Sequence, residues 1–136
     1  MILFVDDERR HIDSYTDDLT RSGYDVVYRP GVDNAVHYFD ANSAEIRLVI
    51  LDLMMSPGKT FENVDTDDGL RTGVHFYYRV REKVPELPVI ILTNVNEDDV
   101  RAIFEGDENC WYFEKEHYLP YEITQEVKRI YPPKQQ

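Results

Sequence analysis

Five short apolar runs, rich in β-branched residues, recur along the chain and alternate with longer segments of mixed polarity. The runs span residues 2–5, 24–28, 48–51, 89–92 and 111–113. Runs of this length and composition are typical of strands that are buried on both faces of a parallel sheet. Because parallel strands must be joined by crossover connections, a chain with a helix-length segment after each run can form few architectures.

The segments after the runs carry apolar residues at helical spacing. In the first segment, Ile12, Tyr15 and Leu19 fall on or near one face, and Gly23 suits the C′ position that ends a helix. The other segments cover about residues 32–41, with Asp33 as a candidate cap, 69–84, 96–104 and 121–131. This alternation predicts an α/β domain of flavodoxin-like type, a doubly wound five-stranded parallel sheet with helices on both faces.

The composition limits the classes of partner. Of the 136 residues, 15 are Lys or Arg and 27 are Asp or Glu, which gives a formal net charge of −12 and disfavours direct binding to nucleic acid or to an anionic membrane. No apolar run approaches the roughly 20 residues of a membrane span, no signal peptide is recognisable, and the single cysteine, Cys110, excludes an intramolecular disulfide. We therefore expect one cytoplasmic domain over residues 1–131 and a C-terminal tail over residues 132–136.

Polar and ionisable side chains follow the apolar runs. Asp6 and Asp7 follow the first run, Asp52 the third and Thr93 the fourth, while Lys115 comes just after the fifth. The carboxyl ends of parallel strands meet at one edge of a sheet, so we expect these side chains to converge. Crowded carboxylates stay ionised when a cation joins them, and a site made of oxygen atoms favours Mg²⁺. A carboxylate beside Mg²⁺ can accept a phosphoryl group, assisted by an ammonium and a hydroxyl group.

Four segments carry these residues, namely FVDDE, LVILDLMM, VIILTN and YFEKE. In order, residue type and strand context they resemble the receiver domain of two-component response regulators, over about residues 2–131. The resemblance implies that Asp52 is the phosphoacceptor. It implies that Mg²⁺ is held by Asp52, by Asp7 and by the backbone carbonyl of Met54, with Asp6 acting mainly through water. It further implies that Lys115 pairs with the phosphoryl oxygens.

Two more residues match the switch positions of that family. Thr93 corresponds to the switch hydroxyl, and Tyr112 corresponds to the aromatic residue whose rotamer reports activation. The sequence departs from the family next to the site. Glu116 stands where receivers usually place a proline, often in a cis peptide, so we expect a trans loop there, and Asn94 stands where a small residue is common.

The connection over residues 56–68 is enlarged, with about 13 residues where 2 to 6 are usual after a strand of this kind. Its sequence NVDTDDG superficially resembles a calcium-binding loop. No register supplies the required ligands, because counting from Asn63 puts Asp68 at position 6 and Val74 at position 12. A solvated, mobile loop is the first interpretation. The alternative is a lid or a partner contact with Phe61 as its apolar anchor.

The resemblance implies a stand-alone phosphoryl-accepting switch rather than a turnover enzyme. A sensor histidine kinase or a phosphotransfer protein would phosphorylate Asp52. Autodephosphorylation would be slow, because Met54 and Val95 offer no polar group to orient a water molecule. Output would pass through the surface of the fourth helix, fifth strand and fifth helix to a downstream protein, or to a second copy in a homodimer.

Three alternative interpretations stay open at this point. The chain could be a receiver excised from a longer protein, with the two prolines after Tyr131 beginning a linker. It could also be a degenerate receiver that acts as a phosphorylation-independent interaction module. A hydrolase of the haloacid dehalogenase type uses a strand-end Asp with Mg²⁺ as well. That family requires a second Asp two residues after the first, however, and Met54 occupies the position.

Overall fold

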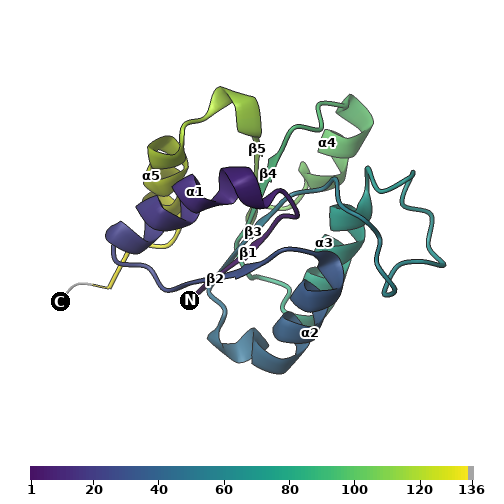
Figure 1. The fold of residues 1–136 in the computed structure, drawn as a ribbon, viewed down its shortest axis with the longest axis horizontal. Coiled ribbons are helices and arrows are strands. Elements are labelled where there is room, and N and C mark those ends of the chain that lie inside the picture. Colours follow the sequence, from purple (N-terminus) through teal and green to yellow (C-terminus); the bar gives the residue numbers. More distant parts are fainter. Residues whose placement is uncertain (135–136) are drawn as a thin grey trace.

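The computed structural model describes residues 1–134 and contains one parallel five-stranded sheet with the strand order β2-β1-β3-β4-β5 (Figure 1). The strands are β1 (Ile2–Val5), β2 (Val26–Arg29), β3 (Leu48–Leu51), β4 (Val89–Thr93) and β5 (Cys110–Glu114). The helices are α1 (Arg9–Arg21), α2 (Val32–Asn42), α3 (Thr72–Lys83), α4 (Asp98–Phe104) and α5 (Pro120–Ile130), with short 3₁₀ helices η1 (Ser43–Glu45) and η2 (Lys115–His117). The predicted doubly wound α/β fold is confirmed.

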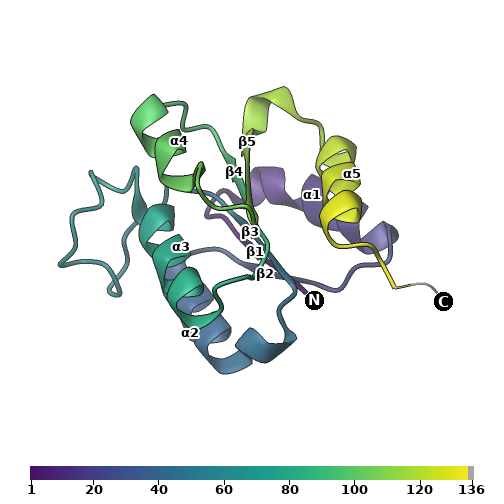
Figure 2. The same cartoon turned by 180° about the vertical axis from the view of Figure 1, so that it is seen from behind.

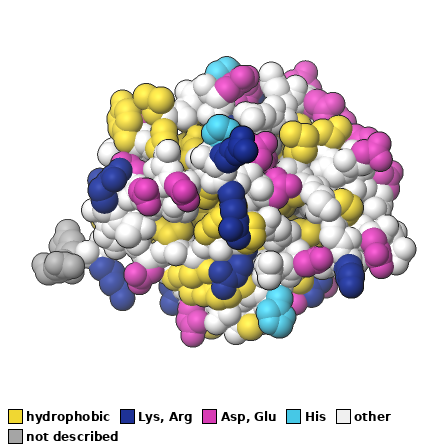
Figure 3. Space-filling model, in the orientation of Figure 1, with side chains coloured by type: hydrophobic (Ala, Val, Ile, Leu, Met, Phe, Trp, Pro, Cys, Tyr) yellow, Lys and Arg dark blue, Asp and Glu magenta, His cyan; other side chains and the backbone are white. Residues whose placement is uncertain are grey.

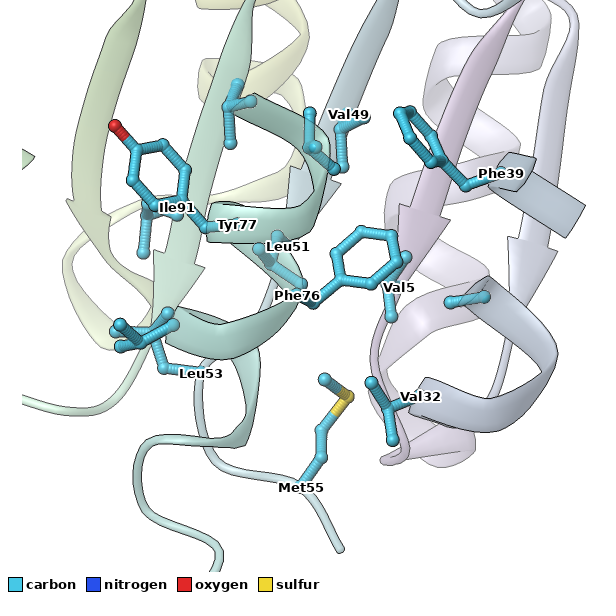
Figure 4. Close-up of a cluster of buried hydrophobic side chains, with 14 of the residues drawn as sticks. Val5, Val32, Phe39, Val49, Leu51, Leu53, Met55, Phe76, Tyr77 and Ile91 are labelled. Carbon is cyan, nitrogen blue, oxygen red and sulfur yellow. The ribbon is translucent and has the colours of Figure 1, made fainter. Parts of the chain in front are cut away.

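The helices cover both faces of the sheet. Figures 1 and 2 show α1 and α5 on one face and α2, α3 and α4 on the other. Successive side chains of a strand point to opposite faces, so each strand supplies two cores. In β1, Leu3 and Val5 belong to the core beneath α2 to α4, whereas Ile2 and Phe4 belong to the core beneath α1 and α5. Figure 4 shows the first of these cores, in which Phe76 of α3 projects toward the sheet.

The inner strands are buried on both faces, as predicted, but the edge strands are not. Every residue of β1, β3 and β4 is buried. All of β2, and all of β5 except Glu114, is only partly buried. The prediction of complete burial was wrong for these two strands, because an edge strand has a neighbour on one side only and the helices do not close over its free side.

Helix α3 begins later than the sequence pattern indicates. We expected it from about residue 69, but it begins at Thr72. Asp67, Asp68 and Gly69 have φ angles of 53°, 54° and 90°, which lie in the left-handed region and are incompatible with a right-handed helix. The connection between β3 and α3 therefore covers residues 52–71, and we call it the β3–α3 loop.

The β3–α3 loop projects beyond α3 (Figures 1 and 2) but is attached to both α2 and α3. The side chain of Phe61 is buried, with its ring 5.7 Å from that of His75, so Phe61 is the predicted apolar anchor. The carboxylate of Asp33 accepts hydrogen bonds from the N–H groups of Lys59 (3.0 Å) and Thr60 (2.9 Å). Asp33 lies inside the first turn of α2 and does not cap that helix, contrary to our prediction, because the loop takes up its carboxylate. These contacts argue against a freely solvated loop.

Regular structure ends with α5 at Ile130, close to the predicted end of the domain. Residues 131–134 form neither helix nor strand, and the last two residues of the predicted tail, 135 and 136, lie outside the described residues. Within residues 1–134, none of the helices has the length and apolar character that crossing a membrane requires.

Candidate functional site

The side chains that were expected to converge at the carboxyl edge of the sheet do meet there. Asp6 follows β1, Asp52 follows β3 and Lys115 follows β5. The Nζ atom of Lys115 lies 2.7 Å from Oδ2 of Asp6 and 3.4 Å from Oδ2 of Asp52. In this strand order the long Lys115 side chain, which starts from the end of β5, passes β4 to reach Asp52 and passes both β4 and β3 to reach Asp6. The side chains of Lys115, Asp6 and Asp52 are only 8%, 1% and 5% exposed, respectively, so these ion pairs are shielded from solvent.

Backbone donors hold the other oxygen of each buried carboxylate. The N–H group of Glu8 donates to Oδ1 of Asp6, and the N–H group of Leu53 donates to Oδ1 of Asp52, both at 2.8 Å. Each carboxylate is therefore fixed in orientation. One of its oxygens is bound to the main chain, and the other is presented to a cation.

The site has more negative than positive charge. Burial raises the pKa of Asp52, and the nearby Lys115 ammonium offsets this only in part. Burial also raises the pKa of Asp6, and the partial burial of the Asp7 carboxylate together with the charge of Asp52 raises the pKa of Asp7. Burial lowers the pKa of Lys115, but the two carboxylates outweigh it, so the pKa is raised and the side chain stays charged. One ammonium does not neutralise three carboxylates, and the site favours a further cation.

The carboxylates fit a magnesium ion. One oxygen from each of Asp6, Asp7 and Asp52 lies within 4.8 Å of the others. Asp6 and Asp52 are buried, whereas Asp7 is exposed. Anionic oxygen atoms are the ligands that Mg²⁺ prefers, and an exposed ligand leaves positions for the water molecules that the ion retains. Met54, whose carbonyl was predicted as a ligand, lines the same cavity as Asp7.

This cavity has a volume of about 420 Å³ and is walled in part by the β3–α3 loop. It is lined by Asp7, Glu8, Met54, Met55, Ser56, Asp68 and Gly69. Our sequence interpretation did not include Asp68 and Gly69 in the site, because the path of an enlarged loop does not follow from strand topology. The available signal was the consecutive Asp67, Asp68 and Gly69, since Asp and Gly are the residues that most readily adopt left-handed turns.

Two glycines allow the loop and α3 to approach the strand that carries Asp52. A Cβ atom on Gly69 would lie 2.8 Å from the carbonyl oxygen of Met55, whose N–H group donates to the Gly69 carbonyl at 3.0 Å. A Cβ atom on Gly73 would lie 2.2 Å from the carbonyl oxygen of Asp52, and the Gly73 N–H group donates to Leu53 at 2.9 Å. The start of α3 therefore rests directly on the end of β3, and the sequence interpretation missed Gly73 as a positioning residue.

Both predicted switch residues contact the backbone of Val95. Thr93 is completely buried at the end of β4, and its hydroxyl accepts a hydrogen bond from the N–H group of Val95 at 3.3 Å. The hydroxyl of Tyr112 donates to the carbonyl of Val95 at 2.6 Å. The guanidinium of Arg101 in α4 lies 4.6 Å from the centre of the Tyr112 ring. The end of β4 is thus linked through Tyr112 to β5 and α4.

Lys115 is the first residue of η2, and this segment borders a cavity on a second side of the site. Glu116, which stands in place of the usual proline, is exposed in η2, and residues 1–134 contain no cis peptide bond, so this loop is trans as predicted. A second cavity of about 370 Å³ lies here, next to α1. Its lining includes Asn94, Lys115 and Glu116, so both cavities border the strand-end site.

No protein-family model matches the sequence, and a comparison with curated protein sequences finds no match. Solved structures do match. A response regulator receiver domain protein from Clostridium thermocellum superposes with a TM-score of 0.72 at 22% identity, over 95% of this chain and 91% of that one. The chain has the receiver-domain fold. Other receiver-domain structures similar to it are a two-component response regulator from Clostridium difficile (TM-score 0.74, 18% identity, 95% and 93% of the two chains) and the chemotaxis protein CheY4 of Vibrio cholerae (0.73, 18%, 95% and 96%).

Proposed function

We propose that this receiver-fold chain is a phosphoryl-accepting switch of a two-component or phosphorelay system, with Asp52 as the acceptor. The observation that carries the proposal is the buried Lys115 ammonium between Asp6 and Asp52, with Asp7 beside them. A buried ammonium among three carboxylates suits a site that receives a phosphoryl group together with a divalent cation. The structural similarity to response regulator receiver domains supports the same proposal.

The phosphoryl group would come from a phosphohistidine on a sensor histidine kinase or a phosphotransfer protein. An oxygen of Asp52 attacks the phosphorus atom, a P–O bond forms, and the P–N bond to the imidazole breaks. The imidazole leaves with the electron pair of that bond and takes up a proton. The product is an acyl phosphate on Asp52. Lys115 and the hydroxyl of Thr93 would stabilise the negative charge on the transferring oxygens.

The chain's own residues would orient the acceptor. The N–H group of Leu53 holds Oδ1 of Asp52, which leaves Oδ2 as the nucleophile on the side of Lys115. The carboxylates of Asp6, Asp7 and Asp52 and the carbonyl of Met54 would hold Mg²⁺. When bound, this ion supplies positive charge next to the phosphoryl oxygens.

The signal would leave the site through Thr93 and Tyr112. A Thr93 hydroxyl drawn toward the phosphoryl group would give up its contact with the N–H group of Val95, whose carbonyl accepts the hydrogen bond from Tyr112. The change would then reach the surface of α4, β5 and α5. We propose that this surface binds a downstream protein, or a second copy of the chain as a homodimer.

The phosphorylated state is expected to persist for minutes or longer. A water molecule attacks an acyl phosphate faster when a polar side chain orients it. The positions two residues beyond Asp52 and Thr93 are occupied by the exposed Met54 and the buried Val95, and neither offers a polar group to orient a water molecule. A lifetime of only seconds for phosphorylated Asp52 would contradict this expectation.

The test is phosphorylation by a small phosphodonor in the presence of Mg²⁺, followed by intact-mass measurement. Wild type is expected to gain one phosphoryl group, and the matched variant Asp52→Asn is expected to gain none. A chelator added before the donor is expected to suppress labelling of wild type. An unlabelled wild type would overturn the proposal in favour of an interaction module that works without phosphorylation.

A further inference from the structure

One acidic residue of the β3–α3 loop lies beside the proposed acceptor site and has no role in the mechanism above. We propose that Asp68 is a specificity-determining residue, whose charge at the mouth of the site disfavours small dianionic phosphodonors and thereby favours a phosphohistidine presented by a protein. This inference rests on the proposed function of Asp52. It adds the class of phosphodonor that the site selects.

The position of Asp68 supports this role. Asp68 lines the cavity of about 420 Å³ that also contains Asp7 and Met54. The preceding residue, Asp67, lines a different cavity with Arg71 and Tyr78, on the side of α3 and α4. Two consecutive carboxylates therefore face different environments.

The backbone around Asp68 is held in place. Asp68 has a φ angle of 54° and is followed by Gly69, whose carbonyl accepts a hydrogen bond from the N–H group of Met55 at 3.0 Å. The N–H group of Gly69 donates to the hydroxyl of the buried Thr66 at 3.2 Å. These bonds connect the end of the loop to the segment that leaves β3. Asp68 is thus fixed beside the site rather than carried on a free loop.

The charge of Asp68 is not compensated by a neighbour. Within residues 1–134, Asp68 forms no ion pair, whereas Asp67 lies 3.9 Å from the guanidinium of Arg71. The charge of Asp68 therefore adds to the charges of Asp7 and Asp52. Acidic side chains are also abundant on the molecular surface that Figure 3 shows. An approaching small dianion meets this field unshielded, whereas a protein donor can bring basic side chains that offset it.

The experiment compares Asp68→Asn with Asp67→Asn. Both substitutions remove one charge, both residues have nearly the same φ angle (53° and 54°), and asparagine tolerates that conformation, so they form a matched pair. Initial rates of Asp52 labelling are measured with acetyl phosphate, a dianion near neutral pH, and with phosphoramidate, a monoanion. We expect Asp68→Asn to accelerate labelling by acetyl phosphate about two- to fivefold, with a smaller gain for phosphoramidate. Asp67→Asn should change neither rate by more than about 1.5-fold, and added salt should reduce the gain.

Binding of Mg²⁺ to the unphosphorylated variants, measured by titration calorimetry, provides a second readout. Mg²⁺ affinity in Asp68→Asn is expected to fall by no more than about two- to fivefold, because a charge that repels a dianion attracts a dication to a similar extent, and labelling rates are therefore compared at saturating Mg²⁺. A loss of Mg²⁺ affinity of more than about tenfold in Asp68→Asn, equal rates for the two variants, or a gain that is the same for both donors would overturn the inference while leaving the acceptor role of Asp52 intact. If wild type and Asp68→Asn both stay unlabelled with either donor, the proposed function fails, and the inference fails with it.

Discussion

The strand-end site and the β3–α3 loop are adjacent and both rich in aspartate, but different features of the fold determine their structures. Asp6, Asp52 and Lys115 each follow a strand of one parallel sheet, and the strand order brings them together. The loop has no strand or helix of its own. It is positioned by single contacts, such as the burial of Phe61 and the hydrogen bonds to Asp33.

The difference also concerns what a carboxylate does in each region. In the strand-end site, burial raises the pKa of Asp52, so its charge is costly in the folded state without a further cation. At the loop, hydrogen bonds from the hydroxyl and N–H groups of Thr60 and from Lys59 lower the pKa of Asp33, so its charge is favourable. The charge of Asp52 in the strand-end site thus destabilises the folded protein, whereas the charge of Asp33, which binds the β3–α3 loop, stabilises it. Substitutions at the two positions can measure these opposite effects.

The largest effect is expected where the two regions touch. In Gly73→Ala, the added Cβ would lie 2.2 Å from the backbone oxygen of Asp52, so the end of β3 or the start of α3 has to move. We expect the free energy of unfolding to fall by about 3 kcal/mol and the rate of Asp52 labelling to fall by a factor of about ten or more. Thermal unfolding and intact-mass kinetics measure the two quantities.

The control for this substitution is Gly106→Ala, because a Cβ there meets no atom within 4 Å. Its unfolding free energy is expected to stay within about 0.5 kcal/mol of wild type. Labelling of Gly73→Ala at the wild-type rate would show that the acceptor does not depend on the start of α3.

Phe61→Ala is expected to weaken the loop and spare the site. The buried ring packs near His75, and its removal should cost about 2–3 kcal/mol, less than in a central core because the cavity left at the loop can collapse. Urea unfolding measures this loss. Asp52 should still be labelled, because its position comes from the sheet. Val64→Ala is the control, since Val64 lies in the same loop and is 42% exposed. Loss of labelling in Phe61→Ala alone would show that the site depends on the loop.

Asp52→Asn is expected to stabilise the protein in the presence of a chelator, on the order of 1 kcal/mol, because it removes a buried charge from a crowded acidic site. Since the pKa of Asp52 in the folded state is raised above its ordinary value of 3.8, the cost of its charge is absent below pH 3.8 and complete above the folded pKa. The advantage of the variant should therefore grow as the pH rises from about 4. Thermal unfolding of wild type and Asp52→Asn against pH tests this, and an advantage that does not change with pH would contradict it.

The different origins of the two regions explain what the sequence could predict. Five apolar runs predicted the parallel sheet, and the topology of such sheets was enough to bring Asp6, Asp52, Thr93 and Lys115 to one edge. Thr93 and Tyr112 both bond to the backbone of Val95, and the switch roles that the resemblance implied for them stay predictions. The convergence of Asp6, Asp52 and Lys115 could be predicted because each follows a strand that a local pattern identifies.

The failures lie where tertiary contacts determine the structure. The late start of α3 follows from three consecutive left-handed residues that end in Gly69, and helical spacing cannot reveal them. Asp33 is a plausible cap by sequence, but the loop takes its carboxylate. Gly73 is needed because the start of α3 lies directly against the backbone of Asp52. Strand topology does not predict this contact. The partial exposure of β2 and β5 depends on strand order, which the runs alone do not give.

The smallest effect is expected for Asp33→Asn. It makes the same chemical change as Asp52→Asn, but it should lower the stability of the protein rather than raise it. The variant weakens the bonds to the hydroxyl of Thr60 (2.6 Å) and to the N–H groups of Lys59 and Thr60, at a cost of roughly 0.5–1 kcal/mol. Because the folded pKa of Asp33 is lowered, this stabilisation is complete above the ordinary value of 3.8 and is lost as the pH falls through the folded pKa. The deficit of the variant should therefore be constant near neutral pH and disappear in acid. Urea unfolding at several pH values measures it, and a shift of both variants in the same direction would contradict the contrast between the two regions.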